Sequence, residues 1–302
     1  MTEITAVTFD LWQTLLLDNR ELGSARAMVR LEGTQQVLNR FGETYELEHI
    51  RQAYRACYQH CRLIREDGLD ISFQEQVEVF VNNISDGLVE RLDSESFPGS
   101  FPGSFNEIAR VYAASFLTHP PTLHAQALTV LKDVKAMGLC IGLISNTGMT
   151  PGTTFRTFLD QHGMLSYFDA LTFSDEVKLA KPNDEIFLMT LRAMGASPSE
   201  TVHVGDHVIN DVVGAKRLGM KTIWITGFYE REDPTDPKSE PDTTVDDLGL
   251  VPGPLRGSQD VSTPVKRNPL DPALARCYCR NAINSWGIFC RKSLISSQLT
   301  KV

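Results

Sequence analysis

Short apolar segments rich in β-branched residues alternate with helical patterns along much of the chain, and this alternation constrains the fold most strongly. Such segments are typical of buried parallel strands. The predicted strands are Ile4–Leu11, Leu139–Ser145, Ala170–Ser174, Thr201–Gly205 and Lys221–Thr226. The predicted helices are His124–Met137, Thr153–Gln161, Asp184–Met194 and Asn210–Leu218. Because parallel strands need crossover connections, the pattern predicts an α/β fold with a Rossmann-like, doubly wound parallel sheet.

Polar side chains stand where the predicted strands end. They are Asp10, Ser145 with Asn146, Asp175, and Asp206. The carboxyl ends of parallel strands open on one edge of a sheet, and ligands of such sheets bind there. We therefore expect these side chains to form a site.

Residues 17–119 show helical periodicity without clear strands, and we expect them to form a helical cap. The core would then be discontinuous, with residues 1–16 and 120–252. Within the cap, the sequence Phe-Pro-Gly-Ser occurs twice in succession before Phe105. Pro and Gly interrupt both helices and strands, so residues 97–105 are predicted to form a surface loop.

The segment 253–302 differs from the rest in composition. From Pro254 onward it holds eight Lys and Arg residues, only two acidic residues and weak periodicity. We expect a mostly disordered extension. Its Cys277 and Cys279 have no second cysteine pair that would indicate a zinc site.

The charge and the N-terminal sequence limit the partners. A net charge of −9 argues against nucleic acid, whose phosphate backbone needs a basic face. The chain has no signal-peptide pattern and no apolar run of bilayer length, and its six cysteines form no disulfide framework. We expect a cytoplasmic protein without a membrane partner that binds a small anionic substrate. Its oligomeric state stays open.

Four segments carry groups that could perform chemistry. Asp10 ends a strand before a turn and could act as a nucleophile, or could simply cap the next segment. Ser145 could hold an anionic oxygen, or could cap a helix. Lys181 opens a helix and could neutralise developing charge. Asp206 and Asp211 flank a turn, which suits a hard cation that prefers oxygen ligands.

Taken in order, these segments resemble the motifs of the haloacid dehalogenase superfamily. The most specific matches are Lys181-Pro182 and the stretch from Val204-Gly205-Asp206 to Asn210-Asp211-Val212. The resemblance covers roughly residues 1–16 and 120–250. It implies that the helical insert is the α-helical cap of that superfamily.

The resemblance also implies roles for individual residues. Asp10 would be a covalent nucleophile. Ser145, with Asn146 and Thr147, would bind the transferring group, and Lys181 would neutralise that group and the nucleophile.

The cofactor implied by the resemblance is Mg²⁺. Its ligands would be the Asp10 and Asp206 carboxylates and the backbone carbonyl of Trp12, while Asp211 would support it directly or through water. The cation would offset the repulsion between a carboxylate and a phosphate dianion.

Trp12 departs from the pattern of most phosphatases of this superfamily, which carry an acid–base aspartate at that position. The expected function is nevertheless a Mg²⁺-dependent phosphohydrolase acting on a small phosphorylated metabolite. Haloacid dehalogenases place an aromatic residue there and use a cap arginine, for which Arg51 is the candidate, but they usually lack the carboxylate of Asp206. The third alternative is a catalytically weak relative that only binds ligand.

Overall fold

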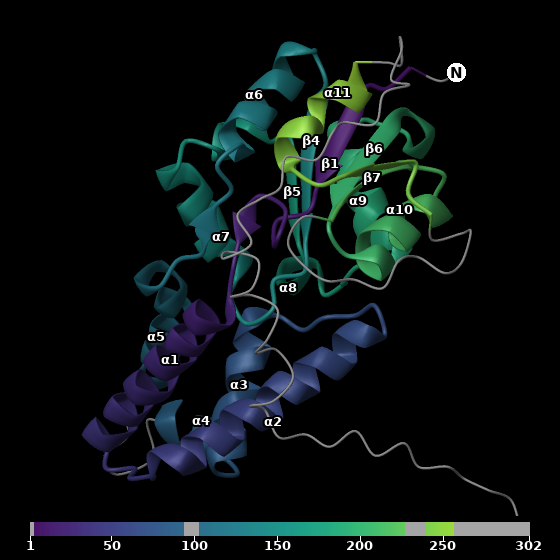
Figure 1. Ribbon diagram of the computed structural model, residues 1–302. Helices are drawn as coiled ribbons and strands as arrows, with labels where there is room; N and C mark the ends of the chain where they lie inside the picture. Colours follow the sequence, from purple (N-terminus) through teal and green to yellow (C-terminus); the bar gives the residue numbers. More distant parts are fainter. Residues whose placement is uncertain (1–2, 94–102, 227–239, 257–302) are drawn as a thin grey trace, which may run out of the picture. The chain divides into compact units, whose positions relative to one another are not determined.

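The computed structural model describes residues 3–93, 103–226 and 240–256 (Figure 1). The described residues belong to a single unit that spans Met1–Gly257. None of the described helices is both long enough and apolar enough to cross a membrane.

Six parallel strands form the main sheet, in the order β5-β4-β1-β6-β7-β8. They are β1 (Ala6–Phe9), β4 (Cys140–Ser145), β5 (Ala170–Phe173), β6 (Thr201–Gly205), β7 (Lys221–Ile225) and β8 (Thr243–Val245). The predicted parallel α/β fold is confirmed. The edge strand β8 was missed because its short Thr-Thr-Val sequence carries no apolar run.

Two apolar clusters cover the two faces of this sheet. One cluster contains Leu143 and packs against α6 (Ala127–Ala136) and α7 (Gly152–Gln161). The other contains the next residue, Ile144, and packs against α9 (Asp184–Met194) and α10 (Gly214–Arg217). Successive residues of a strand point to opposite faces of the sheet, so one apolar strand contributes side chains to both clusters.

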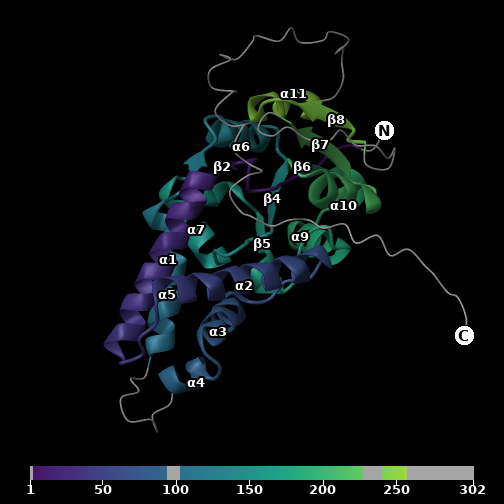
Figure 2. The same cartoon turned by 60° about the horizontal axis from the view of Figure 1, so that its bottom comes forward.

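The insert, which is predicted to be a cap, is helical and has an apolar cluster of its own. Its helices are α1 (Arg20–Arg40), α2 (Leu47–Glu66), α3 (Phe73–Ile84), α4 (Leu88–Asp93) and α5 (Ser104–Thr118). Helices α1 and α5 lie side by side, and α2 packs against α3 (Figure 2). Ser104 and Phe105 belong to α5 and are buried, which corrects the end of the predicted loop. Residues 94–102 lie outside the described residues.

A two-stranded antiparallel sheet joins the ends of the insert. It pairs β2 (Leu16–Leu17) with β3 (Thr122–Leu123), so the chain leaves and rejoins the core at adjacent points. At the other end of the core, Val251 is fully buried and α11 (Pro252–Leu255) packs against α6. The described core therefore continues past the predicted boundary at residue 252, and residues 257–302 lie outside the described residues.

Candidate active site

Asp10 follows β1 at the carboxyl edge of the sheet. Its backbone N–H donates to the carbonyl of Val204 on β6 at 2.8 Å. The chain then turns sharply, because the N–H groups of Leu15 and Leu16 both donate to the carbonyl of Leu11. Gln13 adopts a φ of 56° in this turn, a backbone conformation that few non-glycine residues adopt. The turn holds Asp10, a residue that is 6% exposed, at the edge of a pocket.

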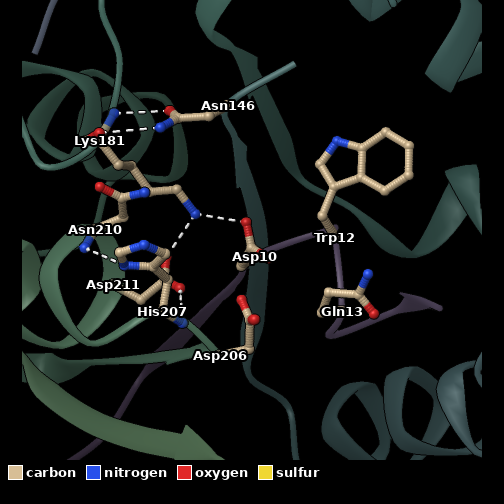
Figure 3. A pocket seen from close by; sticks show the side chains of 9 residues that line it. All are labelled: Asp10, Trp12, Gln13, Asn146, Lys181, Asp206, His207, Asn210 and Asp211. Carbon is tan, nitrogen blue, oxygen red and sulfur yellow. Dashed lines mark hydrogen bonds and ion pairs between the residues drawn. The ribbon is translucent and has the colours of Figure 1, made fainter. Parts of the chain in front are cut away.

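This pocket has a volume of about 380 Å³ and collects most of the predicted residues (Figure 3). It is lined by Asp10, Trp12, Gln13, Asn146, Lys181, Asp206, His207, Asn210 and Asp211. The structure thus brings together side chains from the ends of β1, β4 and β6 and from the segment before α9. This convergence is what the parallel topology predicts for the carboxyl ends of strands.

Lys181 bridges two carboxylates at the base of the pocket. Its Nζ lies 2.6 Å from Asp10 Oδ1 and 2.6 Å from Asp211 Oδ1, and it is 2% exposed. Burial alone would lower the pKa of the lysine, but the two carboxylates raise it above its usual value. The lysine is therefore a fixed positive charge between the two acids.

The two carboxylates differ in their protonation behaviour. Burial raises the pKa of Asp10 to about 6, against the opposing effect of Lys181 and with a further increase from Asp211. Burial acts in the same direction on Asp211, but Lys181 and His203 outweigh it and hold its pKa well below the usual range. Asp211 is thus a permanent anion, whereas Asp10 is close to its point of ionisation.

Gly205 is required for the position of Asp211. A Cβ added to Gly205 would lie 2.4 Å from Asp211 Cγ, so only glycine lets the carboxylate approach the strand. Asp211 Oδ2 accepts a hydrogen bond from the backbone N–H of His207 at 2.8 Å. The glycine at position 205 is therefore explained by the space that Asp211 needs, independently of any role of Asp206.

Three carboxylates could hold a metal ion. Asp10, Asp206 and Asp211 each offer an oxygen, and these oxygens lie within 4.8 Å of one another. A set made of carboxylate oxygens suits a hard cation such as Mg²⁺. Asp211 Oδ1 contacts both Lys181 and His203, whereas Oδ2 accepts one hydrogen bond, from the His207 N–H. Oδ2 therefore has more capacity left to bind a cation. The donor chemistry fits the predicted cofactor.

Trp12 forms a wall of the pocket on the side of Asp10 opposite Lys181 (Figure 3). Its ring packs edge-on against Phe116 at 5.9 Å and Phe155 at 5.4 Å between centroids. The guanidinium of Arg26 lies 5.8 Å from the ring centroid. These aromatic neighbours hold the indole ring in place, so the ring presents an apolar surface to a bound molecule. A tryptophan at this position also supplies no acid.

The residues that follow β4 have different environments. Ser145 Oγ is buried without a hydrogen-bond partner among the described residues. Asn146 clamps the backbone of Lys181, because its Oδ1 accepts from the lysine N–H at 2.7 Å and its Nδ2 donates to the carbonyl at 2.9 Å. Thr147 is buried, and its N–H donates to Ser174 Oγ at 2.9 Å. Asn146 lines the pocket, whereas Ser145 and Thr147 are not among its lining residues.

Arg51 lies away from the pocket-lining residues. It belongs to α2, where its Nε lies 3.2 Å from Glu48 Oε2 and its Nη2 lies 3.7 Å from Met28 Sδ. Its role in substrate binding stays a prediction, and its position in the structure does not support that role.

The helical insert contacts the segment that follows β4 and the segment that precedes Lys181. Arg65 of α2 donates to the carbonyl of Gly148 at 2.6 Å and to Asp70 at 3.0 Å. Asp70 in turn accepts from the hydroxyl of Ser174 at 2.6 Å. An antiparallel bridge between Leu69 and Leu179 ends two residues before Lys181. The insert is therefore attached to the segments that position Asn146 and Lys181.

Sequence reasoning assigned no role to several residues at the site. Gln13, His207 and Asn210 line the pocket, and His203 contacts Asp211 from β6. Burial lowers the pKa of His203, against the opposing effect of Asp211. The one sequence signal for His203 was a histidine inside an otherwise apolar strand.

Comparison with known proteins shows where this chain belongs. A family model for haloacid dehalogenase-like hydrolases matches residues 4–219. The chain is 31% identical over 153 residues to a phosphoserine phosphatase of Thermus thermophilus, which covers 51% of this chain and 58% of that protein. It is 30% identical over 203 residues to the pyrimidine 5'-nucleotidase YjjG of Escherichia coli, which covers 67% of this chain and 81% of the relative. With the phosphoserine phosphatase, the match therefore spans little more than half of the relative's length.

Solved structures share the fold. A 2-haloacid dehalogenase from Pseudomonas syringae has a TM-score of 0.60 at 22% identity, and the alignment covers 84% of this chain and 98% of that one. A HAD phosphatase from Thermococcus onnurineus has a TM-score of 0.56 at 21% identity, covering 85% and 100%. These likenesses show the architecture, and the family model covers most of the described chain. The chain belongs to the haloacid dehalogenase-like hydrolases.

Proposed function

We propose that the protein is a Mg²⁺-dependent phosphohydrolase that acts on a small phosphorylated metabolite, with Asp10 as the nucleophile. The observation that carries the proposal is the cluster of Asp10, Asp206 and Asp211 around one pocket, with Lys181 between two of them. Mg²⁺ would be held by the carboxylates and the Trp12 carbonyl, and when bound it would offset charge on the phosphoryl group.

Asp10 has one oxygen available for attack. Lys181 donates to Oδ1, which leaves the lone pairs of Oδ2 to form a bond to phosphorus as the bond to the leaving oxygen breaks. Water then hydrolyses the acyl phosphate, releasing inorganic phosphate and restoring the carboxylate. The orphaned Ser145 hydroxyl would donate to an oxygen of the transferring group, and Lys181 would stabilise its negative charge.

Relatives with phosphoryl substrates support this reading. Besides the phosphoserine phosphatase and the nucleotidase, a glyceraldehyde 3-phosphate phosphatase of Methanocaldococcus jannaschii is 32% identical over 170 residues, covering 52% of this chain and 70% of that protein. These names describe those proteins, and they favour phosphate esters over other substrates of the fold for this chain.

Trp12 restricts the type of phosphoryl compound. Loss of a general acid typically costs roughly 10²–10⁴-fold in rate, so an alkoxide would leave slowly from this site. We propose that the preferred substrates have leaving groups that need little protonation, such as acyl phosphates, phosphoanhydrides or aryl phosphates. The fixed indole ring and the absence of an acid at position 12 support this restriction.

The direct test measures phosphate release from aryl, acyl and alkyl phosphates, with Mg²⁺ and with chelator. We expect Mg²⁺-dependent release that rises steeply as the pKa of the leaving group falls. Asp10→Asn is the inactive control, because a neutral amide is a poor nucleophile. Equal rates for the parent and this variant would refute nucleophilic attack by Asp10. A flat leaving-group series would refute the restriction.

A haloacid dehalogenase is the second candidate, because a halide leaves without a proton and Trp12 is aromatic. The cluster with Asp206 argues against it, since a metal-independent reaction has no need of three carboxylates. Halide release from a 2-haloacid in chelator would establish this activity. Ligand binding without turnover of either panel would instead indicate a catalytically weak relative.

A further inference from the structure

A buried polar pair lies directly behind the pocket carboxylates. Thr8 of β1 and His203 of β6 are register partners on neighbouring strands, and they are 0% and 1% exposed. The Thr8 hydroxyl lies 2.8 Å from His203 Nδ1, and His203 Nε2 lies 3.2 Å from Asp211 Oδ1. The pair therefore connects the centre of the sheet to the pocket.

The direction of each hydrogen bond follows from the chemistry of Asp211. Its carboxylate already accepts from Lys181 and from the His207 N–H, and an ionised carboxylate can only accept. His203 Nε2 must therefore carry the ring proton. In a neutral imidazole the other nitrogen is an acceptor, so the Thr8 hydroxyl donates to Nδ1 and holds the other end of the ring.

Packing fixes both side chains in these orientations. A Cβ added to Gly142 of β4 would lie 3.0 Å from Thr8 Cγ2, so the threonine methyl packs closely against that glycine. The ring of Phe187 meets the His203 ring edge-on, with 5.2 Å between the centroids and an interplanar angle of 80°. The imidazole is thus confined between a hydroxyl, a carboxylate and an aromatic ring.

We propose that Thr8 and His203 are positioning residues that hold Asp211, and through it Lys181, in the geometry that serves Asp10. Asp211 Oδ1 is shared by His203 and Lys181, and Lys181 is shared by Asp211 and Asp10. Loss of the Thr8 hydroxyl leaves the buried Nδ1 without its donor, so the ring is no longer held at this end and can shift away from Asp211. The carboxylate would then turn away and draw the ammonium from Asp10. The catalytic consequence rests on the proposed function.

The kinetic test compares Thr8→Val, which keeps the shape and removes the hydroxyl, with Thr8→Ser, which keeps the hydroxyl. We expect Thr8→Val to lower kcat about tenfold with little change in KM, as for loss of one buried hydrogen bond. Thr8→Ser should recover most of kcat.

Thr201→Val is the matched control. Thr201 is a fully buried threonine of β6 whose hydroxyl donates to the carbonyl of Ser197 at 2.8 Å, at the start of the strand. It should lose stability without loss of kcat. Equal kcat values for Thr8→Val and the parent, or equal losses in Thr8→Val and Thr201→Val, would overturn the proposal.

A second measurement needs no substrate. Long-range ¹H–¹⁵N NMR spectra distinguish the two imidazole tautomers, and His203→Gln identifies the His203 signal among the seven histidines. We expect the Nε2–H tautomer in the parent, Thr8→Ser and Thr8→Val, and a changed ¹⁵N shift of Nδ1 in Thr8→Val alone, because Nδ1 loses its hydrogen bond there. An Nδ1–H tautomer in the parent, or an unchanged Nδ1 shift in Thr8→Val, overturns the inference whatever the activity. Absence of phosphate release from the parent, with the Nδ1 shift change present, would count against the proposed function alone.

Discussion

Asp10→Asn should stabilise the metal-free protein while it removes activity. Burial raises the pKa of Asp10 from 3.8 to about 6, so the folded state binds its proton more tightly than the unfolded chain does. Between these values the folded state holds more protons, and stability therefore falls as the pH rises. Asparagine mimics the neutral acid and lacks this dependence.

The pKa shift sets the expected size of the effect. The ionised carboxylate costs the parent roughly 3 kcal/mol at pH 7 and roughly 1 kcal/mol at pH 4.5. Asp10→Asn should be more stable than the parent by up to these amounts, because Lys181 keeps its 2.6 Å contact with Asp211. For a chain of this size the gain at pH 7 corresponds to a melting temperature higher by on the order of 5 °C or more.

The assay is calorimetry of both proteins in chelator at pH 7 and pH 4.5, followed by the same scans with Mg²⁺. Mg²⁺ should stabilise the parent more than the variant, because the variant lacks one carboxylate ligand. An Asp10→Asn variant that melts at or below the parent temperature at pH 7 in chelator would refute the reasoning. A gain that is equal at both pH values would assign the effect to something other than ionisation.

Three further outcomes are expected. Asp206→Asn should remove most of the Mg²⁺-dependent rise in melting temperature, whereas Asp247→Asn, which removes an acid outside the pocket, should leave it unchanged in the same scans. Ser145→Ala should lower kcat by roughly tenfold or more in the phosphate-release assay without loss of stability, because its buried hydroxyl has no hydrogen-bond partner within the described part of the chain. Burial also raises the pKa of Asp175 to about 6, so Asp175→Asn should raise the unfolding free energy by up to roughly 3 kcal/mol at pH 7 and by less at pH 4.5 in urea titrations.

The sheet and its active edge were predictable because strand periodicity and crossover rules are local and general. Helix α9 was predicted with its observed limits, since Asn183 caps its first turn and Gly195 ends it. Strand β8 was not, because its pairing with β7 depends on tertiary contact instead of hydrophobic pattern. The prediction that the loop extends to Phe105 was wrong, because Phe105 is apolar and buried in α5. The preceding Pro-Gly-Ser repeat had suggested a continuous turn.

The residues of the site were likewise predictable only in part. Residues that end strands, such as Asp10 and Asp206, could be inferred from position alone. The partners of Lys181 could not, because its two ion pairs join residues 171 and 30 positions apart in the chain. The resemblance implied the contact with Asp10, but the ion pair with Asp211 was not predicted. The clamp by Asn146 was equally hidden, since an asparagine after a strand gives no indication of which backbone it will bind.

The pairing of β2 with β3 has a consequence for how such a protein can diversify. The register partners Leu16 with Leu123 and Leu17 with Thr122 hold the two ends of the insert together within the core itself. The pairing of the strands at the two ends of the insert therefore offsets the entropy cost of closing it, and each doubling of a flexible insert adds only about 0.6 kcal/mol. Different helical modules could occupy this position while the core retained its strand order. Exchange of such a module would alter the surroundings of the pocket, while the strand that positions Asp10 would stay the same.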